Sequence, residues 1–224
     1  MSSPDAELPS LTGQAEDYLK AIYELEQHGA AAGTNDIATR LRIAPASVTG
    51  MIQRLARLGL VESERYKGAR LTDAGRRAAL QLIRRHRIIE SYLVERLGFG
   101  WEDVHDEAER LEHAASDELI ARMAEAIGNP TEDPHGAPIP SAEGRVDETR
   151  LPALSEMDAG RTATVVRMSD RDPQFLRYLD ELGIRPGVAV RLVERAPFDG
   201  PLTLEVDGRS CTIGTTAAGR VFIR

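Results

Sequence analysis

Apolar residues recur at three- and four-residue spacing through most of the first 127 positions, which is the period of amphipathic helices. The pattern predicts six helices, over residues 14–27, 34–41, 45–58, 72–97, 101–115 and 117–127. Cap residues support these bounds: Thr34 and Ser116 can act as N-caps, and Pro45 suits a first helical turn. Gly59 and Gly98 stand where helices can end. We therefore expect a largely helical N-terminal part.

The pattern changes twice further along the chain. Residues 60–64 and 69–71 read as a short β-hairpin between two helices. Residues 129–152 lose the periodicity and carry five prolines and two glycines, which is typical of a linker. Short β-branched runs and one helical insert, at 174–182, then predict a small β-barrel. Its expected strands cover residues 163–167, 188–193, 202–206, 211–213 and 221–223.

Composition limits the class of protein. The 224 residues are 42% apolar, which is enough to bury a core. The single cysteine, Cys211, cannot form an internal disulfide, and we expect it to pack in a core strand rather than bind a metal. No run approaches the roughly 18 uncharged apolar residues of a membrane span, and residues 1–9 lack the cationic and apolar regions of a secretory signal. We expect a cytoplasmic protein with no membrane partner.

Charge is distributed unevenly along the chain. The net charge is −8, but residues 34–87 contain twelve Lys and Arg against four acids, and residues 88–150 contain sixteen acids against five Arg. A basic block beside an acidic block favours a part that binds a polyanion and a part that binds cations. Either block could instead be a solvated face, so the motifs within each block decide between these interpretations.

The basic block has the layout of a winged helix-turn-helix. Two short helices, a tight turn and a hairpin follow one another, and the second helix opens with small and hydroxyl-bearing residues. Hydroxyls at a helix start can reach phosphates or base edges, glycine allows close approach of the backbone, and Arg and Lys supply phosphate contacts. The residues expected to contact DNA are Pro45, Ala46, Ser47, Thr49, Gly50, Arg54, Arg57 and Lys67. The alternative is a helical hairpin with a solvated basic face.

The acidic block brings imidazoles and carboxylates onto common helix faces. At about 100° per residue, two of each fall on one side of the fifth expected helix, and one of each on the fourth. These residues are His105, Glu109, Glu112 and His113 on the fifth helix, and His86 and Glu90 on the fourth. Mixed imidazole and carboxylate sites suit Mn and Fe better than the soft ions that thiolates select. The joint pattern favours a metal sensor over chance decoration of exposed helix faces.

Together these motifs resemble the diphtheria toxin repressor family of metal-dependent transcriptional regulators, over nearly the whole chain. The resemblance is carried by EDYLKAIYEL at 16–25, the expected recognition helix at 45–55, RHR at 85–87, VHDEAERLEH at 104–113, GAPIP at 136–140 and LGIRPG at 182–187. It implies a mainly α fold in which a homodimer binds palindromic double-stranded operators when a divalent metal is present. The implied parts are a winged helix-turn-helix domain over 1–75, a helical metal-binding and dimerisation domain over 76–140, a linker over 141–152 and an SH3-like β-barrel over 153–224.

The resemblance also implies two metal sites. Carried over position by position, the primary site uses Asp17, Glu109, Glu112 and His113. The ancillary site uses His86, Glu90 and His105, with Asp172 or Gln174 as candidate additions from the SH3-like domain. Co, Ni, Zn and Cd are expected surrogates in vitro.

This chain departs from the family pattern in two ways. Iron-responsive members carry Met and Cys at the positions of Asp17 and Glu109, so the oxygen donors here resemble the manganese-responsive branch. Binuclear members of that branch carry an acid where this chain has Lys20, whose ammonium would repel a second cation. The sequence therefore predicts a Mn(II)-dependent repressor and no enzyme, with an Fe(II)-responsive repressor as the alternative.

Two other classes of function stay open at this point. A metallohydrolase with a two-metal site would need an open coordination position and a substrate cleft, and the chain has no separate nucleophile or glycine-rich phosphate loop. A purely structural metal protein would bind metal without any change in its affinity for DNA.

Overall fold

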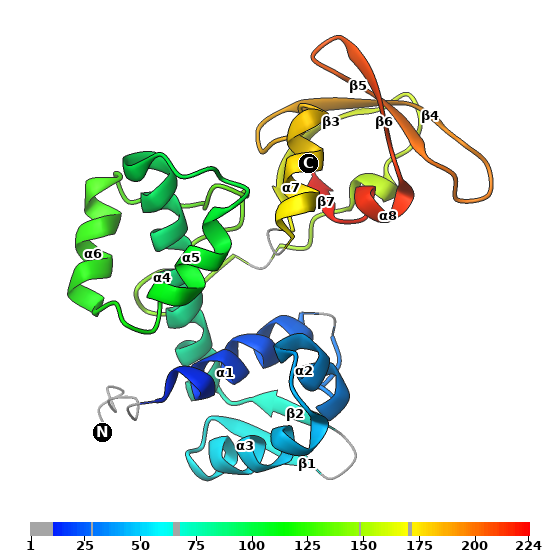
Figure 1. The fold of residues 1–224 in the computed structure, drawn as a ribbon. Coiled ribbons are helices and arrows are strands. Elements are labelled where there is room, and N and C mark those ends of the chain that lie inside the picture. The colour runs from blue at the N-terminus through cyan, green and yellow to red at the C-terminus, as the bar shows by residue number, and fades with distance from the viewer. Residues whose placement is uncertain (1–10, 28, 65–67, 148, 170–171) are drawn as a thin grey trace. The chain divides into compact units, whose positions relative to one another are not determined.

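The structure, a computed structural model, describes residues 11–27, 29–64, 68–147, 149–169 and 172–224 and separates into two compact units (Figure 1). The first unit comprises the chain up to Arg85 together with Pro140–Val146, and the second comprises His86–Ile139 and Asp147–Arg224. The boundary between Arg85 and His86 falls inside the long helix α4 (Asp73–Leu97). No described helix is both long and apolar enough to cross a membrane.

The first unit contains a winged helix-turn-helix, as the sequence predicts. Its elements in chain order are α1 (Gly13–Glu26), α2 (Thr34–Leu41), α3 (Pro45–Arg57), β1 (Val61–Glu64) and β2 (Gly68–Leu71), followed by the start of α4. The apolar stripes of the helices pack into one core that includes Leu19, Ile22, Ile37, Val48 and Leu55. Because α3 buries only this stripe, its opposite face is left exposed to solvent.

Local signals set the ends of these helices. Pro45 occupies the first turn of α3, and Gly59 follows its end with a φ of +71°, as expected. The expectation that Thr34 caps α2 was wrong by one position. Gly33 is the N-cap, and it makes no side-chain cap bond because glycine has no side chain. The preceding residue, Ala32, is paired with Ala69 of the hairpin.

The second unit begins with a helical part, in which α4 packs against α5 (Val104–Leu111) and α6 (Asp117–Ala126) around a core that includes Ile88, Ile89 and Ile120. Ser116 caps α6 through a 3.2 Å hydrogen bond from Leu119 N, as expected. The predicted helix over 101–115 was too long at both ends. Residues 101–103 form a turn, and beyond Leu111 the chain tightens, with Ala114 N donating to Leu111 O at 3.0 Å.

The C-terminal part of the second unit is a small antiparallel β-domain. Its elements are β3 (Thr162–Met168), α7 (Pro173–Glu181), β4 (Ala189–Arg195), β5 (Leu202–Val206), β6 (Arg209–Ile213) and β7 (Val221–Ile223), with the strands in the order β6-β5-β4-β3-β7. All five expected strands and the helical insert are present. Two short elements, η1 (Leu154–Glu156) and α8 (Thr215–Ala218), have too few residues to produce a periodic signal. Cys211 is half-buried on β6 and packs against the core, and burial raises the pKa of its thiol.

Candidate metal centre

The exposed face of α3 carries the residues expected to contact DNA. Val48, Ile52 and Leu55 point into the core of the first unit. The exposed positions are Pro45, Ala46, Ser47, Thr49, Gly50, Arg54 and Arg57. Lys67 lies outside the described residues. A helix start free of bulky or acidic side chains, with two arginines in its last turn, has the chemistry that a DNA groove and its phosphates require.

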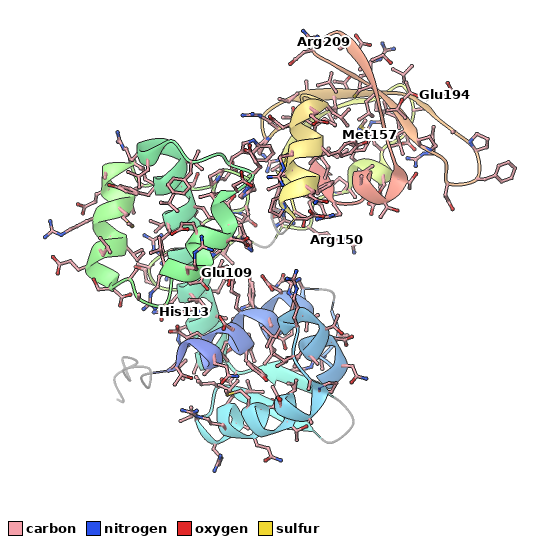
Figure 2. All side chains as sticks on the ribbon, in the orientation of Figure 1. Glu109, His113, Arg150, Met157, Glu194 and Arg209 are labelled. Carbon is pink, nitrogen blue, oxygen red and sulfur yellow. The ribbon has the colours of Figure 1, made fainter. Side chains whose placement is uncertain are left out.

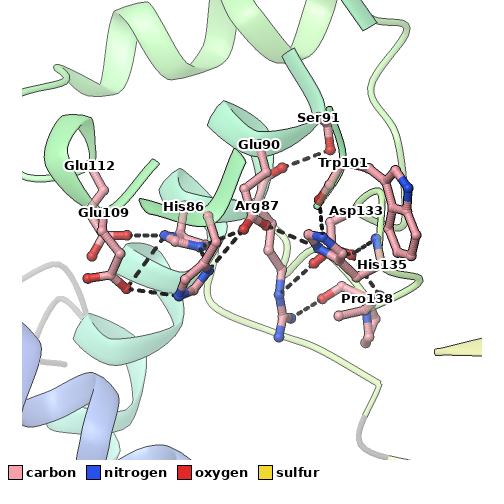
Figure 3. Close-up of polar contacts among 12 residues, drawn as sticks. His86, Arg87, Glu90, Ser91, Trp101, Glu109, Glu112, Asp133, His135 and Pro138 are labelled. Carbon is pink, nitrogen blue, oxygen red and sulfur yellow. Dashed lines mark hydrogen bonds and ion pairs between the residues drawn. The ribbon is translucent and has the colours of Figure 1, made fainter. Parts of the chain in front are cut away.

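His86 is the centre of a group of polar side chains in the second unit (Figure 3). Its Nδ1 lies 2.5 Å from Glu112 Oε2. Its Nε2 lies 2.9 Å from Glu90 Oε1 and 3.0 Å from His105 Nδ1. His86 is only 4% exposed, so these contacts are made away from water. Three of the residues expected in the ancillary site, His86, Glu90 and His105, therefore lie together.

Glu109 extends this group toward solvent. Its Oε1 lies 3.9 Å from His86 Nδ1 and 3.9 Å from His105 Nε2, and its side chain is 40% exposed. His86, His105 and Glu109 each offer one donor atom within 4.8 Å of the others. We call these three residues the His86 cluster. Its nitrogen and oxygen donors suit a borderline to hard divalent ion.

Glu112 and His113 follow directly after α5. Figure 2 shows His113 close to Glu109 at this end of the helix. The Glu112 side chain is fully buried, and its Oε1 lies 3.7 Å from His113 Nε2, while its Oε2 contacts His86. Glu112 therefore links two groups. One is its pair with His113, which is part of the expected primary site, and the other is the His86 cluster. Asp17, the expected partner from the first unit, is half-buried on α1, and Lys20 one turn later on the same helix is 8% exposed.

A second group, which the sequence did not predict, consists of Glu90, Asp133 and His135; we call it the buried cluster. All three side chains are 0% exposed, and each offers a donor atom within 4.8 Å of the others. His135 Nδ1 lies 3.9 Å from Glu90 Oε2 and 4.0 Å from Asp133 Oδ1. Asp133 is held in place because its Oδ1 accepts hydrogen bonds from His135 N (2.8 Å) and Ala137 N (2.9 Å).

The hydrogen bonds of the buried cluster fix which ring nitrogen of His135 carries the proton. His135 Nε2 lies 2.7 Å from the carbonyl oxygen of Trp101, and a carbonyl can only accept, so Nε2 donates. In the neutral ring, Nδ1 then presents a lone pair to two carboxylates. Neither His135 Nδ1 nor Glu90 Oε2 has a hydrogen-bond partner, although both atoms are buried. Buried lone pairs that face one another without a donor are costly unless a cation lies among them.

Glu90 belongs to both groups, with Oε1 directed at His86 and His105 and Oε2 at His135. Burial alone would raise the pKa of Glu90. The positive charge of His86 and hydrogen bonds from His105 and His86 outweigh that effect and hold the pKa well below its usual value. Figure 3 shows the resulting row of contacts from Glu112 through His86 and Glu90 to His135.

Asp172 and Gln174 have a different setting. Asp172 is the N-cap of α7, and its Oδ1 accepts from Gln174 N (3.1 Å) and Phe175 N (3.2 Å). These bonds, and Arg220 3.5 Å from Oδ2, lower the pKa of Asp172 below its usual value despite some opposing desolvation. Asp172 does not belong to any cluster of His, Cys, Asp and Glu donors in the described part of the chain.

Comparison with known proteins agrees with this arrangement. Three family models match: the N-terminal DNA-binding domain of iron-dependent repressors over residues 10–69, their metal-binding and dimerisation domain over 72–141, and the FeoA domain over 153–224. The iron-dependent repressor IdeR of Mycobacterium tuberculosis is 34% identical over 210 residues, which cover 88% of this chain and 90% of that protein. The diphtheria toxin repressor of Corynebacterium diphtheriae is 32% identical over 214 residues, which cover 90% of this chain and 92% of that protein.

Solved structures extend the comparison. A manganese-dependent transcriptional repressor in complex with manganese is 40% identical, with a TM-score of 0.86 over 93% of this chain and 98% of that one. The fold and the donor clusters thus define a metal-dependent transcriptional repressor. The chain belongs to the iron-dependent repressor family that includes the diphtheria toxin repressor. Members of this family are DNA-binding repressors, so the metallohydrolase alternative is excluded.

Proposed function

We propose that this repressor responds to Mn(II), and that it binds palindromic operators of metal-homeostasis genes as a homodimer in the cytoplasm. The donors of the candidate centre support manganese, because the described clusters contain carboxylates and imidazoles and no thiolate. The solved manganese-dependent repressor that is 40% identical to this chain also supports a response to manganese. In this proposal residues 1–75 bind DNA, residues 76–140 bind metal and form the dimer, and residues 153–224 follow the linker at 141–152.

The buried cluster is the observation that carries the proposal. Glu90 Oε2 and His135 Nδ1 are buried without hydrogen-bond partners, and Asp133 is locked beside them by backbone amides. Such a set fits a divalent cation better than an empty core, since ligating groups are normally oriented by hydrogen bonds of this kind. Glu90, Asp133 and His135 would hold one ion. When bound, the ion would supply positive charge to Glu90 Oε2 and His135 Nδ1, whereas Asp133 Oδ2 already lies 3.3 Å from Arg87 Nε.

A second ion would bind to the residues that the resemblance assigns to the primary site. We assign Asp17, Glu109, Glu112 and His113 to it, with His86 and His105 beside them through Glu112 and Glu109. Lys20 is an argument for one ion rather than two at this site, because an ammonium on the same helix as Asp17 repels a second cation. Asp172 and Gln174 are left out, because the Asp172 carboxylate caps α7.

Regulation would follow from the charge of these groups. Carboxylates that lie close together repel one another, and this repulsion destabilises a fixed arrangement of the helices that carry them. A bound cation would neutralise the charges and remove the repulsion. A shift from a mostly incompetent to a mostly competent population needs on the order of 5 kcal/mol of differential binding. Glu112 and Glu90 would make this change cooperative, because each contacts His86 as well as a second group.

The alternative is an Fe(II)-responsive repressor. It is favoured by the relatives from Mycobacterium tuberculosis and Mycobacterium leprae, which are named iron-dependent repressors. Oxygen and nitrogen donors also accept Fe(II), and Irving–Williams order places it slightly above Mn(II). Anaerobic titration with Mn(II) and Fe(II), with DNA binding as the readout, separates the two.

The proposal is tested by selection from a pool of random duplex DNA in the presence of Mn(II) or of a chelator. We expect Mn(II) to enrich a palindrome and the chelator to abolish enrichment. The same sequence enriched equally well in both conditions would contradict a role for metal. Co(II), Ni(II), Zn(II) and Cd(II), tested in the same assay, show which ions act as surrogates.

A further inference from the structure

The loop that carries Asp133 and His135 lies against the C-terminal β-domain within the second unit. Met168 N, at the end of β3, donates a 3.0 Å hydrogen bond to the carbonyl oxygen of His135. Next to it, Gly136 has a φ of +81°, and a Cβ built there would lie 1.8 Å from Val166 O. The backbone of the loop and the backbone of β3 are therefore in direct contact, with no space for any side chain at position 136.

The ring of His135 is held from the same direction. Its Nε2 donates to the carbonyl oxygen of Trp101, whose side chain is 7% exposed and belongs to the hydrophobic core of the β-domain. The guanidinium of Arg185, which precedes β4, lies 5.2 Å from the centre of the Trp101 ring. Both the backbone and the ring of His135 are thus fixed by groups that belong to, or pack on, the β-domain.

We propose that the β-domain orients His135 in the metal centre by packing against its loop, and that Gly136 is the positioning residue that permits this. Without a Cβ at 136, β3 reaches the loop, the Met168 amide fixes the His135 carbonyl, and Nδ1 is directed at Glu90. The β-domain then contributes to metal affinity through its contact with the loop that carries His135. This inference rests on the proposed metal-binding role of the buried cluster.

The chain provides a matched control for a test at Gly136. Gly128 has nearly the same backbone conformation, with a φ of +80°, but a Cβ added there would meet nothing within 4 Å. Gly128→Ala and Gly136→Ala therefore impose similar backbone strain, and only Gly136→Ala pushes β3 away from the loop. The difference between the two variants isolates the contact with β3.

Two measurements report on these variants: one follows the packing of the loop against the β-domain, and the other follows the binding of Mn(II). Trp101 is the only tryptophan of the chain, so its emission in metal-free protein reports the packing between the loop and the β-domain. Calorimetric titration with Mn(II) reports the number of ions bound and their affinities. We expect Gly136→Ala to shift the emission to longer wavelength and to weaken one Mn(II) by about 10- to 100-fold, the range for loss of groups that orient a ligand. Gly128→Ala should leave both readouts at the wild-type values.

His135→Ala distinguishes the metal-binding role of the buried cluster from the positioning role of Gly136. Loss of one bound Mn(II) in this variant supports the buried cluster as a metal site, whereas an unchanged number of ions would remove that part of the proposed function. If His135→Ala loses an ion but Gly136→Ala shifts the Trp101 emission and keeps wild-type Mn(II) affinity, the positioning role is wrong. Unshifted emission in Gly136→Ala would contradict it as well.

If Gly136→Ala does not fold, Arg185→Ala replaces it. This substitution removes the guanidinium over Trp101 without changing any residue of the loop or of β3. Arg191→Ala, at an exposed position of β4, is its control. We expect a smaller change of the same kind, with shifted emission and weaker binding of one Mn(II). Identical Mn(II) titrations for Arg185→Ala and Arg191→Ala would overturn the proposal.

Discussion

The exposed face of α3 and the candidate metal centre of the second unit place polar side chains in opposite surroundings. On α3 they are exposed to solvent, where charges are screened and act nearly independently. In the candidate metal centre Glu90, Glu112 and His135 have no exposed surface. His86 contacts both Glu112 and Glu90, and Glu90 in turn contacts His135. In such surroundings each charge depends on its neighbours. Substitutions should therefore have large, coupled effects in the metal centre and small, additive effects on α3.

The largest effect is expected at Glu90, because this carboxylate serves both donor clusters. Glu90→Gln keeps the shape of the side chain but removes the charge and one acceptor oxygen. We expect Mn(II) affinity to fall on the order of 100-fold, with both classes of site weakened together. Calorimetric titration measures this, and Glu118→Gln, at a side chain 75% exposed on α6, is the control. Weakening of one class alone would show that the two clusters are independent.

A change of ligand type at Glu109 should alter metal preference rather than abolish binding. Glu109 is the most exposed member of the His86 cluster, with a side chain 40% exposed, so a smaller group fits there without strain. Glu109→Cys introduces a thiolate, and we expect preference to move about tenfold toward Fe(II), Co(II) or Zn(II) relative to Mn(II). Competition titrations give the ranking. An unchanged ranking would mean that Glu109 is not a ligand.

The low pKa of Glu90 makes the stability of the metal-free protein depend on pH. A carboxyl whose pKa is lowered by folding stabilises the protein above its ordinary pKa of 4.5, and this contribution is lost as pH falls through the folded-state value. Below pH 4.5 the free energy of unfolding should fall more steeply in wild type than in Glu90→Gln, by at most about 1.4 kcal/mol per pH unit. Urea unfolding at several pH values tests this, and equal slopes would contradict an ionised Glu90.

On α3, Arg54→Ala and Arg57→Ala should each have a modest effect. Both side chains are exposed in the last turn of the helix, where they can reach phosphates. Each substitution should weaken binding to all duplexes alike and reduce the salt dependence of log K by about 0.9 per lost phosphate contact. Anisotropy titrations at several salt concentrations measure the slope, and Arg122→Ala, at an exposed position of α6, is the control. Loss confined to one base position would instead identify a base-reading arginine.

The smallest change in stability is expected at Gly50, and its sign is informative. A Cβ at Gly50 meets nothing within 4 Å, so Gly50→Ala should stabilise α3 by about 0.5–1 kcal/mol. If the backbone of α3 approaches DNA closely at this point, the same methyl group should weaken operator binding. Thermal unfolding and operator affinity, measured on one sample, test both. A variant that is more stable and binds equally well would show that the close approach does not occur at Gly50.

The helical periodicity of the sequence explains which parts of the candidate sites could be predicted from it. The exposed face of α3, and the shared helix face of His86 and Glu90, follow from the spacing of residues along one helix. The grouping of His105 with them was implied by the resemblance to the repressor family, because His105 lies on a different helix, α5. Asp133 and His135 lie between prolines in a segment without a period, which was interpreted as the start of the linker. Their positions depend on hydrogen bonds to Trp101 and to β3, which are distant in sequence.

The central claim is that Glu90, Asp133 and His135 hold a divalent cation within a metal-dependent repressor. The most direct measurement is an anomalous difference map from crystals of the full chain grown with Mn(II). We expect a peak within bonding distance of Glu90 Oε2 and His135 Nδ1, and a separate peak beside Glu112 and His113. A map with full occupancy beside Glu112 and His113 and no density between Glu90 and His135 would contradict the claim.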